Sequence, residues 1–195
     1  MLTSQQPEHS VAAVRIPHMA TVEQAAATTA RLRAAVESRD ADAFAGTLAP
    51  DVVLHSPITA ATTFIGVDEV RELLRDVLKV VHDIHYTDDV GDEKTRALFY
   101  TATVRGVAVE EATRVRLDDA ALITEMTIWF RPLPGLTALM AALGPKLAAR
   151  QGRAKAALAT LMTTPLAAGT KAGDRAAVRL IRPGARKSGR APDGW

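Results

Sequence analysis

Apolar residues recur at helical spacing in two stretches of the N-terminal half. Residues 22–40 carry one apolar face among good helix formers, and Thr21 stands where a helix N-cap is expected. Asp40 is suited to cap a short second helix. A stronger apolar stripe covers residues 64–81. The sequence therefore predicts three helices here, the third opened by Asp68.

Other segments alternate between apolar and polar residues, as half-buried strands do. The first runs from Val52 to Ser56 and stops at Pro57, which cannot donate a hydrogen bond within a sheet. Four more segments follow the third helix and are joined by short turn-forming sequences. They cover residues 83–90, 95–104, 107–117 and 122–131. This order predicts an α+β fold with an antiparallel meander.

The C-terminal region has a different composition, rich in Ala, Leu and basic residues. We predict a helical extension over residues 133–182, broken at Gly144-Pro145 and again near Pro165. The mixed polarity of residues 1–19 predicts a flexible N-terminal arm. The Gly, Pro, Arg and Lys of residues 183–195 predict a disordered tail.

Charge is distributed unevenly, and this narrows the choice of partners. The net charge is +2, but residues 1–143 carry −7 and residues 144–195 carry +9. The basic region has no interleaved aromatic residues and no known motif, so we expect no nucleic-acid binding. A solvated helical face that docks partly by charge on the acidic body is favoured, and membrane-surface binding is the minority alternative.

The composition excludes several kinds of chemistry. The chain has no Cys, so disulfides, thiolate catalysis and cysteine-ligated metals are excluded. No phosphate loop, nucleophile elbow or dinucleotide fingerprint is present, and His82 and His85 on a strand point to opposite faces. We therefore predict neither a cofactor nor a metal site. The uncharged stretches are short of a membrane span and no signal peptide is recognisable, which predicts a cytoplasmic protein.

The element order, with the phrases ESRDADAF, LAPDVVLHSP, FIGVDEVRELL and LITEMTIWFRPL, resembles the nuclear transport factor 2-like superfamily, and its SnoaL-like branch in particular. The resemblance covers residues 20–132. It implies a cone in which a curved sheet wraps a long helix and leaves an apolar pocket at its open end. Members include ketosteroid isomerases, polyketide cyclases, scytalone dehydratase and limonene-epoxide hydrolase, and many others only bind ligands or partners. The resemblance is specific for fold and weak for chemistry.

The comparison with ketosteroid isomerases can be made residue by residue. The family's Tyr on the first helix falls near Leu32 here. Its basic Asp falls on Ser56, and its hydrogen-bonding Asp falls on Thr113. None of these replacements can do the same work, so the resemblance implies that isomerisation by that machinery is excluded.

Strand alternation, anchored on Thr113 as a pocket position, assigns one face to the pocket. The predicted inner residues of the last three strands are Leu98, Tyr100, Glu111, Thr113, Met126, Ile128 and Phe130. From the first strand, Ser56 is predicted at the pocket, and His55 either at the pocket mouth, as a ligand-binding residue, or on the back of the strand. A one-residue bulge would invert any of these assignments.

Glu111 and Tyr100 are the candidate catalytic residues. A carboxylate among apolar residues loses hydration, which raises its pKa towards the value that a general base needs. Tyr100 can donate a hydrogen bond to a carbonyl or enolate. The alternatives remain open: Glu111 at the rim or paired with an Arg, Tyr100 as a core residue, and His55 as a structural residue.

The opposite face of the sheet predicts a contact between two copies of the chain. Trp129 is surrounded there by Arg114, Arg116 and Arg131, together with acidic residues. A large aromatic residue among alternating charges suits a dimer interface, and a solvated face is the alternative.

Two functions therefore remain after the sequence is read. The first is a small-molecule pocket protein with acid–base catalysis of the isomerase, cyclase or dehydratase type, acting without metal on an apolar carbonyl compound. The alternative is a non-catalytic ligand-binding or protein-interaction module.

Overall fold

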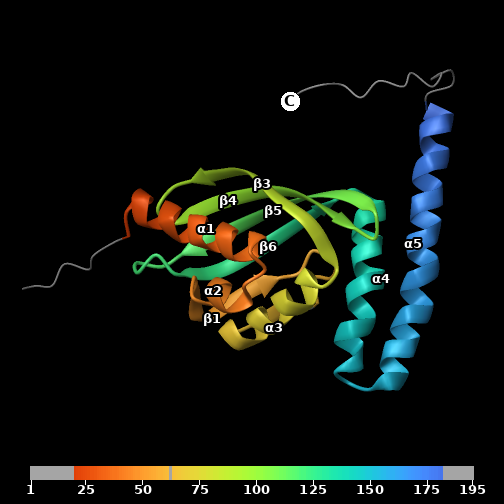
Figure 1. Cartoon of the computed structure of the whole chain (residues 1–195), viewed down its shortest axis with the longest axis horizontal. Helices are drawn as coiled ribbons and strands as arrows, with labels where there is room; N and C mark the ends of the chain where they lie inside the picture. Colours follow the sequence, from red (N-terminus) through yellow and green to blue (C-terminus); the bar gives the residue numbers. More distant parts are fainter. Residues whose placement is uncertain (1–19, 62, 182–195) are drawn as a thin grey trace, which may run out of the picture.

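The computed structural model describes residues 20–61 and 63–181, in which a curved sheet of six strands wraps around helices (Figure 1). The helices are α1 (Val22–Glu37), α2 (Ala41–Ala45), α3 (Val67–Leu78), α4 (Leu133–Ala149) and α5 (Arg153–Ile181). The strands are β1 (Leu48–His55), β2 (Thr63–Ile65), β3 (Val81–Gly91), β4 (Thr95–Val104), β5 (Val107–Leu117) and β6 (Ile123–Arg131). The α+β cone fold with a C-terminal helical extension is thus confirmed. The expected arm over residues 1–19 and tail over residues 183–195 lie outside the described residues.

The two N-terminal helices begin where their caps predict. Thr21 and Gln24 form a capping box at the start of α1. The Asp40 carboxylate accepts hydrogen bonds from two backbone amides of α2, which satisfies donors that a helix start leaves unpaired. The expected apolar face of α1 is buried against the sheet, and Leu32 is among its fully buried side chains.

The sheet order is β2-β1-β6-β5-β4-β3. Strands β3 to β6 form the predicted antiparallel meander, whereas β1 pairs with β6 in parallel. The sequence did not predict β2, which pairs with β1 through Phe64 and its neighbours. For this reason α3 begins after Gly66, at a positive φ of 91°, and the expectation that Asp68 opens the helix was wrong.

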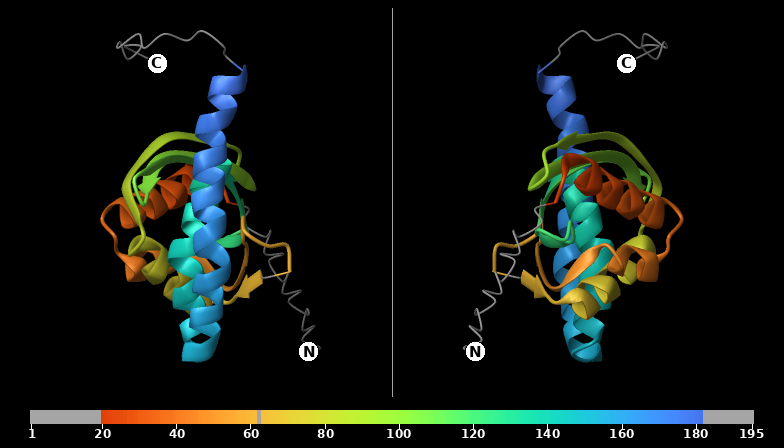
Figure 2. Two further views of the ribbon diagram at one scale, coloured as in Figure 1. Left: turned by 90° about the vertical axis from the view of Figure 1, so that its right-hand side faces the viewer. Right: turned by 90° about the vertical axis from the view of Figure 1, so that its left-hand side faces the viewer.

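Helix α4 stands across one end of the cone, where it contacts both the sheet and α3 (Figure 2). Its Leu139 and Leu143 are buried, and Gly135 packs so closely on Val109 of β5 that an added Cβ would lie 2.4 Å from that side chain. At the other end of α4, the Arg150 guanidinium lies 2.5 Å from the Asp76 carboxylate and donates to the carbonyl of Glu72, both on α3. The helix is therefore held to the cone at both ends.

The predicted helix breaks at Gly144-Pro145 and near Pro165 were wrong. Both prolines lie inside continuous helices, and the chain turns instead at Gly152, whose φ of 124° favours glycine. Packing explains this, because apolar residues on both sides of Pro145 contact the cone and hold the two halves of α4 in line.

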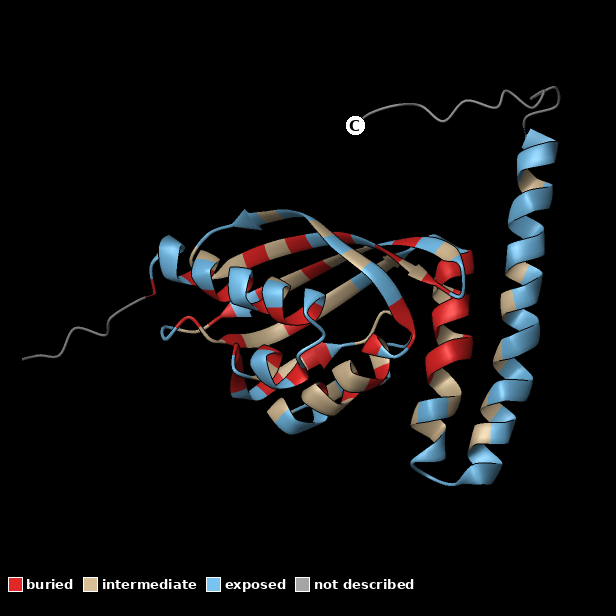
Figure 3. Cartoon of the chain, viewed as in Figure 1, coloured by how far each residue is buried: buried red, intermediate tan, exposed pale blue. Residues whose placement is uncertain are grey.

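Helix α5 packs along α4 and is otherwise exposed (Figure 3). None of its residues is buried. Within the described part of the chain, Arg150 makes the ion pair between the extension and the cone, and no basic residue of α5 pairs with an acidic one of the cone. The expected electrostatic docking therefore rests on one residue. None of the helices described is long and apolar enough to cross a membrane.

Candidate functional site

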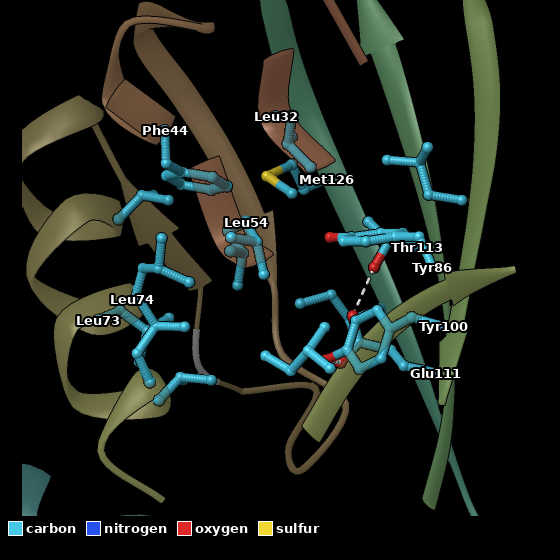
Figure 4. Close-up of a pocket in the computed structure, with 17 residues that line it drawn as sticks. Leu32, Phe44, Leu54, Leu73, Leu74, Tyr86, Tyr100, Glu111, Thr113 and Met126 are labelled. Carbon is cyan, nitrogen blue, oxygen red and sulfur yellow. Dashed lines mark hydrogen bonds between the residues drawn. The ribbon is translucent and has the colours of Figure 1, made fainter. Parts of the chain in front are cut away.

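A cavity of about 80 Å³ lies inside the cone, between the sheet and α1, α2 and α3, and we call it the inner cavity (Figure 4). Its apolar lining residues are Leu32, Val36, Phe44, Leu54, Val70, Leu73, Leu74, Val77, Leu78, Ile84, Leu98, Met126 and Ile128. The remaining lining residues are Tyr86, Tyr100, Glu111 and Thr113, which come from three neighbouring strands. The polar groups of the site are thus gathered on the sheet, opposite apolar helices.

Glu111 is the one carboxylic acid among these lining residues, and both oxygens of its carboxylate accept hydrogen bonds. The Tyr100 hydroxyl donates to Oε2, and the Thr113 hydroxyl donates to Oε1 over 2.7 Å. The strand register produces this arrangement, because Tyr100 of β4 lies directly opposite Glu111 of β5. Glu111 is half-buried and Tyr100 is buried.

Burial shifts the acidity of all three ionisable groups in the inner cavity. It raises the pKa of Glu111 to about 7, although the hydrogen bonds from Tyr100 and Thr113 favour the carboxylate and oppose the shift. Burial, followed by the nearby Glu111 charge, raises the pKa values of Tyr86 and Tyr100 above the usual value for a phenol. At neutral pH the site therefore holds an acid near its midpoint and two neutral phenols.

A second cavity, also of about 80 Å³, adjoins the first, and we call it the outer cavity. Its lining combines shared residues with residues of the β1–β2 connection, β6 and α4: Leu54, Ser56, Pro57, Ile58, Phe64, Leu73, Val77, Val81, Glu111, Ile128, Phe130, Leu139, Leu143 and Leu147. Glu111 lines both cavities. The carboxylate thus lies where the two cavities adjoin.

The structure brings together almost all the residues predicted for the pocket. Leu98, Thr113 and Met126 line the inner cavity, Ser56 and Phe130 line the outer one, and Ile128 lines both. The inward direction of Glu111 and the outward direction of Glu110 also match the expected register.

The placement of His55 in the pocket was wrong. His55 is exposed and pairs with Thr127 across the sheet, while its neighbours Leu54 and Ser56 line the cavities. Strand β1 stays extended up to His55, so alternation keeps this side chain on the outer face.

Tyr86 is the cavity residue that sequence reasoning missed. It lies on β3 two positions after Ile84, and both line the inner cavity. Its ring meets that of Tyr100 edge-on, with 5.3 Å between centroids, and Arg33 lies 5.4 Å from the Tyr86 centroid. The sequence does carry a signal for it, because alternation along the predicted strand 83–90 places Ile84 and Tyr86 on the same face. The sequence analysis assigned inner faces only to the three strands that follow.

The outer face of the sheet has a different character. Trp129 is 52% exposed, with the Arg114 guanidinium over its ring. Arg114 donates to Glu125 over 2.9 Å, and Arg131 pairs with Glu110. Charges on this face are thus paired around an accessible aromatic ring.

Within residues 20–61 and 63–181, no three His, Asp or Glu side chains gather closely enough to hold a metal ion.

Comparison with solved structures relates the fold to known proteins. A steroid delta-isomerase from Pseudomonas aeruginosa is 28% identical with a TM-score of 0.61, over 68% of this chain and 98% of that one. An uncharacterised protein with a cystatin-like fold from Silicibacter pomeroyi is 25% identical with a TM-score of 0.60, over 68% of this chain and 93% of that one. A de novo designed protein with a curved β-sheet is 16% identical with a TM-score of 0.50, over 56% of this chain and 87% of that one.

Comparison with curated protein sequences finds no significant match. The model of the SnoaL-like domain matches residues 29–126, which run from α1 to the middle of β6. The chain therefore belongs to the SnoaL-like domain family of the nuclear transport factor 2-like superfamily.

Proposed function

We propose that this protein catalyses proton transfer on a small apolar carbonyl compound, with Glu111 as the general base. One observation carries the proposal: a carboxylate with a pKa of about 7 lies between two apolar cavities. A base of this pKa is half deprotonated at neutral pH and strong enough to accept a proton from an activated carbon. No Arg, Lys or His lines either cavity in the described part of the chain, so the carboxylate is not neutralised by an ion pair.

The proposed step is an enolisation. Glu111 takes the proton from the carbon next to the carbonyl. The electron pair of the broken C–H bond forms a C=C bond to the carbonyl carbon, and the π pair of the C=O bond moves onto the oxygen. The proton then returns to the same or a different carbon, so the product is an isomer or the exchanged substrate. The enolate oxygen carries the developing charge and needs a hydrogen-bond donor.

Tyr86 is the proposed donor to this oxygen. Tyr100 already donates to Glu111, so we assign Tyr100 the task of positioning the base, together with Thr113. The Tyr86 hydroxyl has no hydrogen-bond partner among the described residues, and burial keeps it protonated. This revises the sequence-based expectation that Tyr100 itself donates to the substrate.

The similarity to a steroid delta-isomerase supports proton transfer as the reaction class. The proposed base differs from the family's, because its usual position is occupied by Ser56, which borders the outer cavity. The proposed base therefore lies on β5, which is separated from β1 by β6 in the same sheet.

Non-catalytic ligand binding is the second candidate, and one observation favours it. Both oxygens of Glu111 are already occupied by donors of the protein itself. A carboxylate whose oxygens are both hydrogen-bonded need not react; its role in a binding pocket is then to orient the hydroxyls of Tyr100 and Thr113.

Exchange of ketone α-protons for deuterium, followed by NMR with 2-butanone in D₂O, separates the two candidates. We expect the protein to accelerate exchange, with a rate that rises with pH through about 7 as Glu111 loses its proton. Glu111→Gln should lower the acceleration by about 100-fold or more. Glu110→Gln is the matched control, since this neighbour pairs with Arg131 on the outer face, and it should change nothing. Ketone binding without any acceleration would favour the binding module.

A further inference from the structure

The outer cavity is built by a part of the chain that the family match does not include. Its wall opposite Phe130 consists of Leu139, Leu143 and Leu147, which follow one another at helical spacing on α4. The family match ends at residue 126, before α4 begins. The second cavity is thus formed by the extension together with the cone.

The position of α4 is fixed well enough to define a binding surface. Gly135 packs on Val109 at the start of the helix, and Arg150 pairs with Asp76 at its end. The Arg150 side chain also reaches the Glu72 carbonyl over 3.3 Å. Between these two attachments, the leucines that line the outer cavity belong to, or pack against, the buried core.

The chemistry of the outer cavity differs from that of the inner one. Apart from Glu111, its polar side chain is that of Ser56, whose hydroxyl already accepts a hydrogen bond from the Ile58 amide over 3.1 Å. No charged residue other than Glu111 lines it. A charged or strongly polar group would lose hydration there without gaining a partner.

We propose that the outer cavity binds the unbranched alkyl tail of the substrate, and that α4 sets the length of tail that fits. The carbonyl head lies in the inner cavity, where the hydroxyls of Tyr86 and Thr113 are found, and the tail passes Glu111 toward Leu147. This inference rests on the proposed function for the position of the head. It names the substrate class as short-chain or medium-chain alkyl ketones.

The volumes set the size of the group. A dry apolar cavity of about 150 Å³ holds one benzene ring, so an outer cavity of about 80 Å³ favours a narrow chain over a ring. Each methylene that enters an apolar cavity should tighten binding by about fourfold. Affinity should therefore rise with chain length and then stop when the chain reaches α4.

The test measures dissociation constants of methyl ketones from 2-butanone to 2-decanone by titration calorimetry. Leu147→Phe narrows the outer cavity at a half-buried position. We expect it to raise the dissociation constant of 2-octanone at least tenfold, while that of 2-butanone changes less than twofold. Leu147→Ala widens the cavity and should extend the rising part of the series to longer chains. Met140→Phe is the matched control on the same helix, at a half-buried residue that lines neither cavity, and should leave the series unchanged.

Two results would overturn the proposal. In the first, Leu74→Phe, which narrows the inner cavity alone, stops the rise of affinity with chain length at a shorter ketone, while both Leu147 variants leave that rise unchanged. The other is an absence of ketone binding at millimolar concentration. Tail binding needs no proton transfer, so Glu111→Gln should keep the chain-length dependence. A chain-length dependence without deuterium exchange would therefore contradict the proposed catalysis and leave the tail site standing.

Discussion

The two faces of the sheet use the same residue types for opposite purposes, and Glu110 and Glu111 show this most directly. Glu110 points outward, is exposed and pairs with Arg131. Glu111 points into the cone, where hydroxyls are its hydrogen-bond partners and burial raises its pKa to about 7. One step along a strand changes a solvated surface charge into a group able to act as a base.

The two faces also differ in how their polar groups are compensated. On the outer face, opposite charges lie next to each other in contact with water, as with Arg114 and Glu125. Such exposed pairs contribute little to the free energy of folding. On the inner face, each hydroxyl or carboxylate is surrounded by apolar residues, so its protonation state depends on its few neighbours. Chemistry is therefore expected on the inner face and recognition between proteins on the outer one.

The largest effect should come from truncating adjacent residues of β4 that point to opposite faces. Leu98 is 1% exposed and lines the inner cavity, whereas Phe99 is 38% exposed on the outer face. We expect Leu98→Ala to lower the free energy of unfolding by about 3 kcal/mol. Phe99→Ala should cost less than half as much, although Phe is the larger side chain. Urea denaturation measures both, and equal losses would show that the outer face is packed in solution.

The next effect depends on pH and concerns Glu111→Gln. Because the pKa of Glu111 is higher in the folded than in the unfolded chain, folding takes up a proton between about pH 4.5 and 7, and stability falls as pH rises through that window. The amide cannot ionise, so its stability relative to the natural protein should grow from nothing near pH 4.5 to about 3 kcal/mol at pH 8. Thermal unfolding across this range measures the difference. Glu110→Gln should show no such trend. A stability difference that stays flat with pH for Glu111→Gln as well would mean that the inner carboxylate is solvated.

The sequence predicted this difference between the two carboxylates in two steps: alternation places them on opposite faces of one strand, and the family resemblance at Thr113 identifies the face of Glu111 as the inner one. The register of β4, β5 and β6 follows from regular pairing, so Tyr100, Glu111 and Ile128 were assigned correctly to one face. For His55 the sequence left two positions open, the pocket mouth and the back of the strand, and the pocket mouth was wrong. Alternation, which β1 keeps to its end, places His55 on the back.

A smaller effect should distinguish α4, which packs on the sheet, from α5, which packs along α4. Gly135 of α4 has no space for a Cβ beside Val109, whereas Gly169 of α5 has no atom within 4 Å of that position. We expect Gly135→Ala to lower the free energy of unfolding by about 1–2 kcal/mol. Gly169→Ala should stabilise by roughly 0.5–1 kcal/mol, because alanine loses less backbone entropy on entering a helix. Opposite shifts in melting temperature are expected, and a stabilising Gly135→Ala would show that α4 is loosely attached.

The smallest effect on the folded monomer should come from Trp129→Glu. The ring is half exposed, so the melting temperature of the monomer should change little. If two copies associate through the outer face, as we expect from Trp129 and its arginines, the substitution should weaken the dimer in sedimentation experiments. A protein that is monomeric at high concentration would exclude the expected dimer.

The extension shows where sequence reasoning stops. Its helical character followed from composition, but the local rule that proline breaks a helix was overridden at Pro145 by contacts that only the folded cone supplies. The outer cavity was equally hidden, because Leu143 and Phe130 are brought together by the path of α4 across the mouth. No periodicity within either segment encodes that meeting.

The parallel pairing of β1 with β6 has a consequence for the order in which the chain folds. Leu54 of β1 pairs with Met126 of β6, so β1 can join the sheet only after β6 has formed. Contacts between consecutive strands from β3 to β6 are local in sequence and can form early. Closing the long loop to β1 costs entropy that only later burial recovers. The meander should be structured in the folding transition state and β1 should join afterwards. Both walls of the inner cavity, and hence the environment of Glu111, would then exist only after the final step of folding.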